Sequence, residues 1–297
     1  MIDTTSTSPL GSSAFRLFAW LHYPVVMTVV FSLFAWLQWQ GASLVMSTYV
    51  PVLFAAGTVT LLELAFPHRS EWKPPATEIR TDLVFMSAIQ LALPPLVSFL
   101  FVYLLIAPAR ALDLRAALLW PHGLPLWLQG VLMVLAVDFL RYWLHRFAHE
   151  NDTLWRLHSV HHSVEQRYWL NTARFHPLEK ALQMCLDSLP FLLMGVDARV
   201  LGLYYVAYAS NGFFQHCNVH LRYGFLNYIV GSAETHRWHH SRVPRESNSN
   251  YGNTVIIWDL VFGTWYLPRD RDIQDLGLQD PGYPKTFFGL MCAPFRR

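Results

Sequence analysis

Residues 17–62 read LFAWLHYPVVMTVVFSLFAWLQWQGASLVMSTYVPVLFAAGTVTLL and contain no Asp, Glu, Lys or Arg. A helix that crosses the hydrocarbon core of a bilayer needs about 20 apolar residues. The stretch is therefore long enough for two membrane spans, and we expect the chain to turn near Gln40 and Gly41 between them. A second charge-free stretch, Leu83–Ala109, predicts a third span.

A fourth span is predicted for Ala116–Val137, and its helix is expected to continue into Asp138 and Arg141. The composition is that of a membrane protein, because 53% of the 297 residues are hydrophobic and only 14% are charged, against about one quarter in soluble domains. The net charge of +2 leaves no basic field for nucleic acid. We therefore expect an all-α integral membrane bundle of about four transmembrane helices within residues 16–137.

The segments outside these spans differ in character. Residues 1–15 are mostly Ser, Thr and Gly and predict a disordered N-terminal tail. Apolar character returns in residues 181–215, but Asp187, Asp197 and Arg199 divide this stretch into pieces too short to span a bilayer. A re-entrant or interfacial pair of helices is expected there.

Basic residues predict the orientation of the bundle. Of the 22 Lys and Arg residues, 16 lie at or beyond Arg141, and the connection 67–82 carries further ones. Cytoplasmic segments carry an excess of Lys and Arg. Residues beyond the fourth span are therefore expected to form a cytoplasmic cap, ending in a cytoplasmic tail over residues 267–297.

Histidines mark the chemistry of this cap, since 11 of the 14 lie between positions 145 and 240. The segment DFLRYWLHRFAH ends with His145 and His149, four residues apart, which lie on one face of a helix. In the following segment LHSVHH, the spacing predicts that three imidazoles share one stripe. The same two patterns recur later in the chain. Together these clusters provide ten candidate metal ligands: His145, His149, His158, His161, His162, His216, His220, His236, His239 and His240.

Imidazole ligands indicate a transition metal, because magnesium and calcium prefer oxygen. Ten nitrogens are too many for one ion, but two ions would receive about five each and keep a position open for oxygen or substrate. A structural zinc site closes at four ligands and usually includes cysteine. The sequence therefore predicts a catalytic di-metal centre, and no catalytic residue separate from it.

Further polar residues are candidates to hydrogen-bond the ligands or to replace one of them. Ligand imidazoles usually donate their second ring N–H to a carboxylate or carbonyl. Asp138 precedes His145 on the same helical face, although it could instead pair with Arg141. His176 precedes Pro177, where it could support a ligand or simply begin a helix. The other candidates near the clusters are Asn171, Arg174, Glu179, Asn218 and Asp259.

Residues 138–266 resemble the fatty acid hydroxylase and sterol desaturase superfamily of membrane-bound, non-haem di-iron oxygenases. The resemblance rests on the boxes HRFAH, LHSVHHS and HRWHHS, together with RFHPLE, FQHCN and NYGNTVIIWDLVFGT. It implies a four-span bundle with a cytoplasmic histidine cap, two iron ions as cofactor and O2 as co-substrate. The short first box and the HPLE segment look closer to bacterial sterol-desaturase-like members than to the sphingolipid 2-hydroxylases, which implies the bacterial inner membrane.

Carried over by position, the resemblance makes every candidate histidine except His220 a ligand. In relatives, the recurring feature of this segment is a histidine followed by an asparagine, here His216 and Asn218. Either Asn218 or His220 could therefore complete the set. The activity implied is attack by activated oxygen on an unreactive C–H bond of a lipid.

The chain contains no dinucleotide fingerprint, no cysteine cluster and no haem attachment motif. A separate electron donor, of ferredoxin or cytochrome type with its reductase, is therefore expected. Hydroxylation of a lipid is the first hypothesis, because it needs one hydrogen abstraction. Desaturation and cleavage of an ether lipid are alternatives at the same centre. A metal transporter would place its ligands at mid-membrane, and an inactive relative would be expected to have lost histidines.

Overall fold

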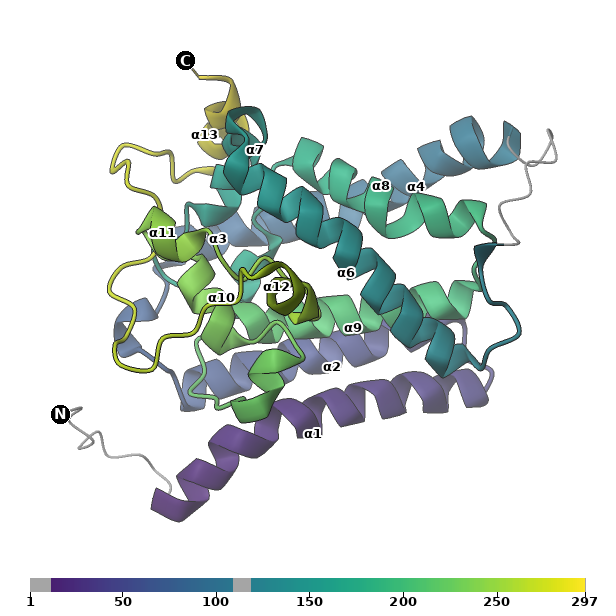
Figure 1. Ribbon diagram of the computed structural model, residues 1–297, viewed down its shortest axis with the longest axis horizontal. Coiled ribbons are helices and arrows are strands. Elements are labelled where there is room, and N and C mark those ends of the chain that lie inside the picture. The colour runs from purple at the N-terminus through teal and green to yellow at the C-terminus, as the bar shows by residue number, and fades with distance from the viewer. Residues whose placement is uncertain (1–11, 109–118, 297) are drawn as a thin grey trace.

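The computed structural model describes residues 12–108 and 119–296, and within these ranges the regular elements are helices (Figure 1), which confirms the all-α fold. The longer helices are α1 Ser12–Trp39, α2 Leu44–Ala65, α3 Ala76–Phe85, α4 Leu93–Phe101, α6 Leu126–Glu150, α7 Asp152–His162, α8 Pro177–Leu193 and α9 Ala198–His216. Four short α-helices follow, α10 Ala233–His239, α11 Pro244–Ser247, α12 Ile257–Phe262 and α13 Phe287–Cys292. Short 3-10 or π segments are η1 Ser70–Trp72, η2 Met86–Ala92, η3 Val102–Ile106, η5 Trp169–Ala173, η6 Gly224–Tyr228 and η7 Ala293–Phe295.

Within the part of the chain that the structure describes, four helical segments are long and apolar enough to cross a membrane, as the hydropathy of the sequence predicts. They are Phe15–Trp39, Leu44–Ala65, Ala76–Ile106 and Leu126–Glu150. The turn between the first two begins at Gln40, and Ser43 caps α2 by accepting a hydrogen bond from the Met46 amide. The helix of the fourth span begins at Leu126, after Pro125, and the predicted start at Ala116 lies outside the described residues.

The third span is a continuous helical rod that contains two π-helical segments. The regular helices α3 and α4 alternate with the π-helical segments η2 and η3. Pro94 and Pro95 stand just after η2, and neither provides a backbone N–H for an ordinary helical hydrogen bond. Such missing bonds favour local rewinding, so the two prolines explain why a wider turn precedes them.

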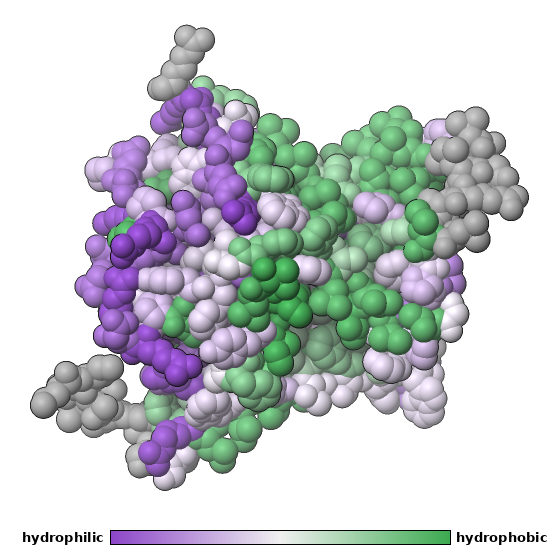
Figure 2. All heavy atoms as spheres, viewed as in Figure 1, coloured by the Kyte–Doolittle hydropathy of each residue, from purple (hydrophilic) through white to green (hydrophobic). Residues whose placement is uncertain are grey.

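Many large apolar side chains of the spans face outward. On α2, for example, Leu53, Leu61 and Leu64 are 66%, 68% and 73% exposed. In water such contiguous exposure would be unfavourable, whereas lipid tails solvate it. Figure 2 shows the corresponding division: hydrophilic residues gather at the left end, where Figure 1 has α10 and α11, and apolar residues cover the body of the bundle. The protein is therefore a multi-pass membrane protein with a hydrophilic end near α10 and α11.

The helices α8 and α9 cover the stretch expected to form a helical pair. Helix α9 packs against α1, α2 and α6, and its inward face is buried through residues such as Val206 and Phe214. Asp197 begins α9 by accepting a hydrogen bond from the Arg199 amide. How deeply this pair enters the bilayer stays a prediction.

The two predicted tails have different outcomes. Residues 1–11 of the expected N-terminal tail lie outside the described residues, and α1 already begins at Ser12. The C-terminal segment packs on the bundle, because Leu290 of α13 is fully buried in a cluster with Phe85 and Val160. This segment is therefore part of the folded cap.

A buried ionic cluster joins the third span to residues 168–174, which lie between α7 and α8. Arg174 donates from Nε to Asp82 Oδ1 at 2.6 Å and from Nη2 to Glu78 Oε2 at 2.5 Å. Tyr168 donates to the other oxygen of Asp82 at 2.6 Å. Asp82 and the Arg174 side chain are 0% and 2% exposed, so the cluster holds both elements in one geometry.

We expect Asp82→Ala to lower the free energy of unfolding by about 3–5 kcal/mol, because it leaves the buried Arg174 guanidinium without its main partner. Lys285→Met is the matched control, since Lys285 forms an exposed ion pair with Glu165, and such pairs contribute about 0–1 kcal/mol. Thermal or denaturant unfolding of both variants in detergent micelles measures the difference. Equal stability of the two variants would contradict the structural role of the cluster.

Candidate metal centre

Nine of the ten candidate histidines lie in two groups whose ring nitrogens converge within 4.8 Å of one another. The first group consists of His145, His149, His158, His162 and His239. The second group consists of His161, His216, His236 and His240. The rings of His162 and His240 stack with their centroids 4.6 Å apart, so the two groups are neighbours in one centre.

The division between the groups does not follow the order of the boxes along the chain. Consecutive residues on a helix point about 100° apart. His161 and His162, at the end of α7, therefore reach different groups, and His239 and His240 do the same at the end of α10. The three α7 histidines, for which the spacing predicts one shared stripe, therefore divide between the groups: His158 and His162 belong to the first and His161 to the second.

The first group has the geometry of ligands around a shared cation. His162 Nε2 lies 3.1 Å from the Nε2 atoms of His149, His158 and His239. Nitrogens held about 2.1 Å from one ion at right angles are about 3.0 Å apart. His145 Nε2 is also buried without a hydrogen-bond partner in the described residues. Lone pairs that converge in this way repel one another until a cation lies between them.

The second group repeats this geometry. His236 Nε2 lies 3.0 Å from His216 Nε2 and 3.2 Å from His240 Nε2, and the rings of His161 and His240 are 4.8 Å apart. The two groups thus offer five and four imidazole nitrogens. This donor set fits a pair of transition-metal ions.

Most of these histidines are oriented by a hydrogen bond at the opposite ring nitrogen, Nδ1, which leaves Nε2 free for a metal. Carbonyl and carboxylate oxygens accept these bonds, so the proton position follows from the partner. The acceptors are Tyr251 O for His145 (2.8 Å), Asn248 Oδ1 for His149 (3.0 Å), Glu179 Oε1 for His158 (2.7 Å), Arg174 O for His161 (3.3 Å), Asn171 Oδ1 for His216 (2.9 Å) and Ser249 O for His239 (2.7 Å).

Three of the predicted supporting residues therefore contact histidines of the centre. Glu179 and Asn171 do so with their side chains, and Arg174 does so with its backbone carbonyl. The Arg174 side chain instead enters the ionic cluster with Asp82. The side chain of Arg174 is fixed by the carboxylate of Asp82, and its backbone carbonyl accepts a hydrogen bond from His161. The ionic cluster of the third span therefore also positions His161.

Two of the predicted supporting carboxylates accept hydrogen bonds from backbone amides near the centre and form no hydrogen bond with a histidine of the two groups. Asp138 accepts hydrogen bonds from the amides of Thr254 and Val255. Asp259 accepts from the amides of Tyr251 and Gly252, at 2.8 and 2.7 Å. Both carboxylates thus hold the loop that supplies the carbonyl acceptor for His145.

The other three predicted positions lie outside the two groups. His176 caps α8, where its Nδ1 accepts from the Leu178 amide at 3.3 Å. Asn218 exchanges hydrogen bonds with the backbone of Arg69 at 3.0 and 2.8 Å. His220 lies beside Phe15 and His68, with ring centroids 5.0 and 5.7 Å away.

Residues 248–251 are functional positions that the sequence does not reveal. Two of their three contacts to histidines are made by backbone carbonyls, which every residue has. The loop is shaped by Asn250, whose φ of 54° is left-handed, a conformation that asparagine tolerates better than most residues. The side-chain amide of Asn250 donates hydrogen bonds to the carbonyl oxygens of Thr235 and Tyr266. The signals in the sequence are the closely spaced asparagines and the motif NYGNT, which begins at Asn250 and does not itself say which atoms contact the histidines.

Burial keeps the rings outside the membrane spans neutral. It lowers the pKa of His161, His236 and His240 well below the ordinary value, and the nearby imidazoles of the centre, which disfavour more than one positive charge in this space, lower it further. Neutral imidazole is the form that binds a metal. The site is therefore ready to bind a cation at neutral pH.

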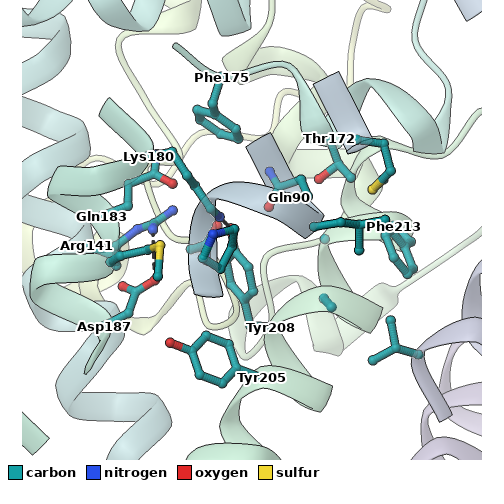
Figure 3. Close-up of a pocket in the computed structure, with 18 of the residues that line it drawn as sticks. Gln90, Arg141, Thr172, Phe175, Lys180, Gln183, Asp187, Tyr205, Tyr208 and Phe213 are labelled. Atoms are coloured by element: carbon teal, nitrogen blue, oxygen red, sulfur yellow. Dashed lines mark hydrogen bonds and ion pairs between the residues drawn. The ribbon is translucent and has the colours of Figure 1, made fainter. Parts of the chain in front are cut away.

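A cavity of about 520 Å³ opens beside both groups. Apolar residues of α2 and the third span form one wall, for example Leu44, Val52 and Pro94. Figure 3 shows the polar side chains from α6, α8 and α9 that form another. The histidines that line the cavity are His145, His158, His161, His216 and His236.

Comparison with known proteins agrees with this centre. Residues 130–264 match the family model described as Fatty acid hydroxylase. An ornithine lipid hydroxylase, OlsE, of Rhizobium tropici is 32% identical over 253 residues, which cover 84% of this chain and 75% of that protein. The alkylglycerol monooxygenase of Danio rerio is 34% identical over 145 residues, 49% of this chain and 32% of that protein. Methylsterol monooxygenase 2-2 of Arabidopsis thaliana is 27% identical over 157 residues, 52% and 59% of the two chains. No solved structure matches the chain significantly.

We expect His161→Ala and His239→Ala each to remove most of the bound metal, because each takes a nitrogen from a different group. His220→Ala is the control and should keep the full metal content, since His220 lies outside both groups. Elemental analysis of the purified variants measures the metal per chain. Loss of metal in His220→Ala, or full metal in both other variants, would overturn the assignment.

Acid is expected to destabilise the metal-free protein. The imidazole of an unfolded chain has an ordinary pKa of about 6.5, whereas burial lowers the pKa of His162 and His239 in the folded state well below this value. Below about pH 6.5 the unfolded chain therefore takes up protons that the folded chain does not. The free energy of unfolding should fall by up to about 1.4 kcal/mol per pH unit for each such ring. Unfolding midpoints between pH 8 and 5 test this, and a midpoint that does not fall contradicts it.

Proposed function

The chain belongs to the fatty acid hydroxylase family and hydroxylates a C–H bond of a lipid, and on this premise we propose that its two histidine groups hold two iron ions. The observation that carries the proposal is the convergence of two neighbouring groups of buried or half-buried imidazoles at the wall of a cavity within an apolar bundle. Neither group contains a cysteine thiolate, which separates the centre from common structural zinc sites. Imidazole-rich sites with open positions suit iron that reacts with oxygen.

When bound, the metal pair would supply the activation of dioxygen. The overall reaction is balanced by an external donor: the lipid C–H bond, O2, two electrons and two protons give the lipid C–OH and one water. A one-electron carrier, of ferredoxin or cytochrome type, is the proposed source of the electrons. The proposed site of its approach is the hydrophilic end of the molecule, near α10 and α11 (Figures 1 and 2).

The residues of this chain contribute positioning and exclusion of water. Glu179 holds the His158 ring through a 2.7 Å hydrogen bond, and Asn171 holds the His216 ring at 2.9 Å. The cavity keeps the reacting part of the lipid beside these rings, where a fixed geometry lowers the barrier to reaction. Its apolar wall on α2 and the third span limits access of bulk water.

We further propose that the substrate is an amino-acid-containing lipid of the ornithine lipid kind. The named relative acts on ornithine lipid, and its similarity covers 84% of this chain. It therefore extends beyond the histidine region into the spans that line the cavity. The similarity to alkylglycerol monooxygenase covers 49% of the chain, and for this reason ether-lipid oxidation is the second candidate.

The proposed orientation places the histidine centre on the cytoplasmic side of a bacterial inner membrane. The excess of Lys and Arg at and beyond Arg141 supports it through the positive-inside rule. Reduced electron carriers are then available on the side where the hydrophilic end is exposed.

Host membranes that contain the protein, grown under isotopically labelled dioxygen, are expected to accumulate an ornithine lipid with one labelled oxygen. Mass spectrometry of the extracted lipids measures it, and His161→Ala is the control that should abolish it. A product two hydrogens lighter without label would indicate desaturation. A labelled fatty aldehyde released from an ether lipid would instead support the second candidate.

A further inference from the structure

A buried ammonium group lines the cavity without a carboxylate partner. Lys180 on α8 is 4% exposed. Its Nζ donates one hydrogen bond, to the Tyr208 hydroxyl at 3.1 Å, and lies 5.1 Å from the centre of the Tyr208 ring. Among the described residues, no carboxylate forms a direct ion pair with it: Asp187 interacts with its charge at longer range and is itself paired with Arg141. An ammonium has three protons to donate, so two of them are left over for another acceptor.

The other cationic side chain of the cavity, that of Arg141, has a carboxylate partner. Arg141 on α6 donates to Asp187 Oδ2 at 3.2 Å, and both side chains are buried. Figure 3 shows Arg141, Asp187 and Gln183 on one side of the cavity, with Lys180 close to them and Phe213 on the opposite side. Leaving a charge buried without a partner is unfavourable. Of these two cations, therefore, only Lys180 lacks an ion-pair partner.

Lys180 lies close to the metal centre. The Phe175 ring is 5.9 Å from Lys180 Nζ and stacks on the His161 ring with centroids 4.2 Å apart. Glu179, the preceding residue, holds His158. One aromatic ring therefore separates the ammonium from an imidazole of the second group, and a group bound by Lys180 would be near the reacting atoms.

We propose that Lys180 and Tyr208 form an anchor for a carboxylate of the lipid, which places a carbon within a few bonds of that carboxylate at the metal centre. The inference rests on the proposed function, whose substrate it specifies. A carboxylate compensates the ammonium and forms strong charge-assisted hydrogen bonds. The hydrocarbon chain of the lipid would extend along the apolar wall at Leu44, Val52 and Pro94. The carboxylate could belong to an amino-acid headgroup or to a free fatty acid.

Binding without turnover tests the anchor directly. The probes are N-palmitoyl-ornithine, its carboxyl methyl ester and palmitic acid, each titrated into the metal-loaded protein in detergent. Charge-assisted hydrogen bonds change affinity by about tenfold to hundredfold, so the wild type should bind the acid at least about tenfold more tightly than the ester. Equal affinity of acid and ester for the wild type overturns the proposal without any variant.

Two variants locate the effect. Lys180→Met should abolish the preference for the acid over the ester, and Lys180→Arg should keep most of it, both with unchanged metal content. Lys285→Met, at an exposed lysine paired with Glu165, is the control and should behave as the wild type. A Lys180→Met variant that still prefers the acid overturns the proposal. Tighter, Lys180-dependent binding of either N-palmitoyl-ornithine or palmitic acid supports the anchor and identifies the source of the carboxylate.

Turnover separates this inference from the function on which it rests. Under the proposal, Lys180→Met raises KM more than it lowers kcat, and fragmentation of the wild-type product places the labelled oxygen near the carboxylate. Labelled product whose formation does not depend on Lys180 overturns the anchor and leaves the hydroxylase standing. Acid-selective binding with no labelled oxygen in any lipid supports the anchor and contradicts the proposed hydroxylation.

Discussion

The convergence of imidazole Nε2 atoms inside a buried space is the constraint on which the rest of the structure depends. Nitrogens 3.0–3.2 Å apart, such as those of His162 and His149 or His216 and His236, cannot all be paired by hydrogen bonds. Their lone pairs repel one another without a cation, and the rings can neither charge nor turn away in a dry interior. The surrounding elements must therefore hold the rings in place, and the metal must supply the missing attraction.

The elements that hold the histidine rings belong both to the membrane bundle and to the polar cap. Helix α6 is at once the fourth membrane span and the source of His145 and His149. The loop 248–251 is fixed by Asp259 and Asn250 and in turn supplies oxygen acceptors to three rings. The third span reaches the centre through Asp82 and Arg174. A membrane bundle and a polar cap thus share one rigid site, which lets an oxidising centre face a lipid taken from the bilayer.

Hydropathy and helical spacing were sufficient to predict the bundle and the gathering of the histidines. The charge-free run 17–62 could only form two spans, and the i, i+3 and i+4 spacings place imidazoles on common faces. Spacing on one helix does not say which partner a ring meets, so the exchange of His161 and His239 between groups depends on tertiary packing. The same limit applies to His220, which repeats the spacing of His149 but follows the end of α9 and points to Phe15 and His68. Carbonyl partners leave no trace in the sequence at all.

Helix α8 connects the metal centre with the substrate cavity. Consecutive residues on it have opposite tasks: Glu179 turns towards His158 and orients a ligand, whereas Lys180 turns towards Tyr208 in the cavity. Because both side chains are fixed to one helix, the distance between a bound polar group and the metal centre is set by backbone geometry. A lipid held at Lys180 can shift along the cavity only by breaking that contact. In this arrangement, the choice of carbon follows from the position of the polar group in the lipid, and the length of the hydrocarbon chain has less influence on it.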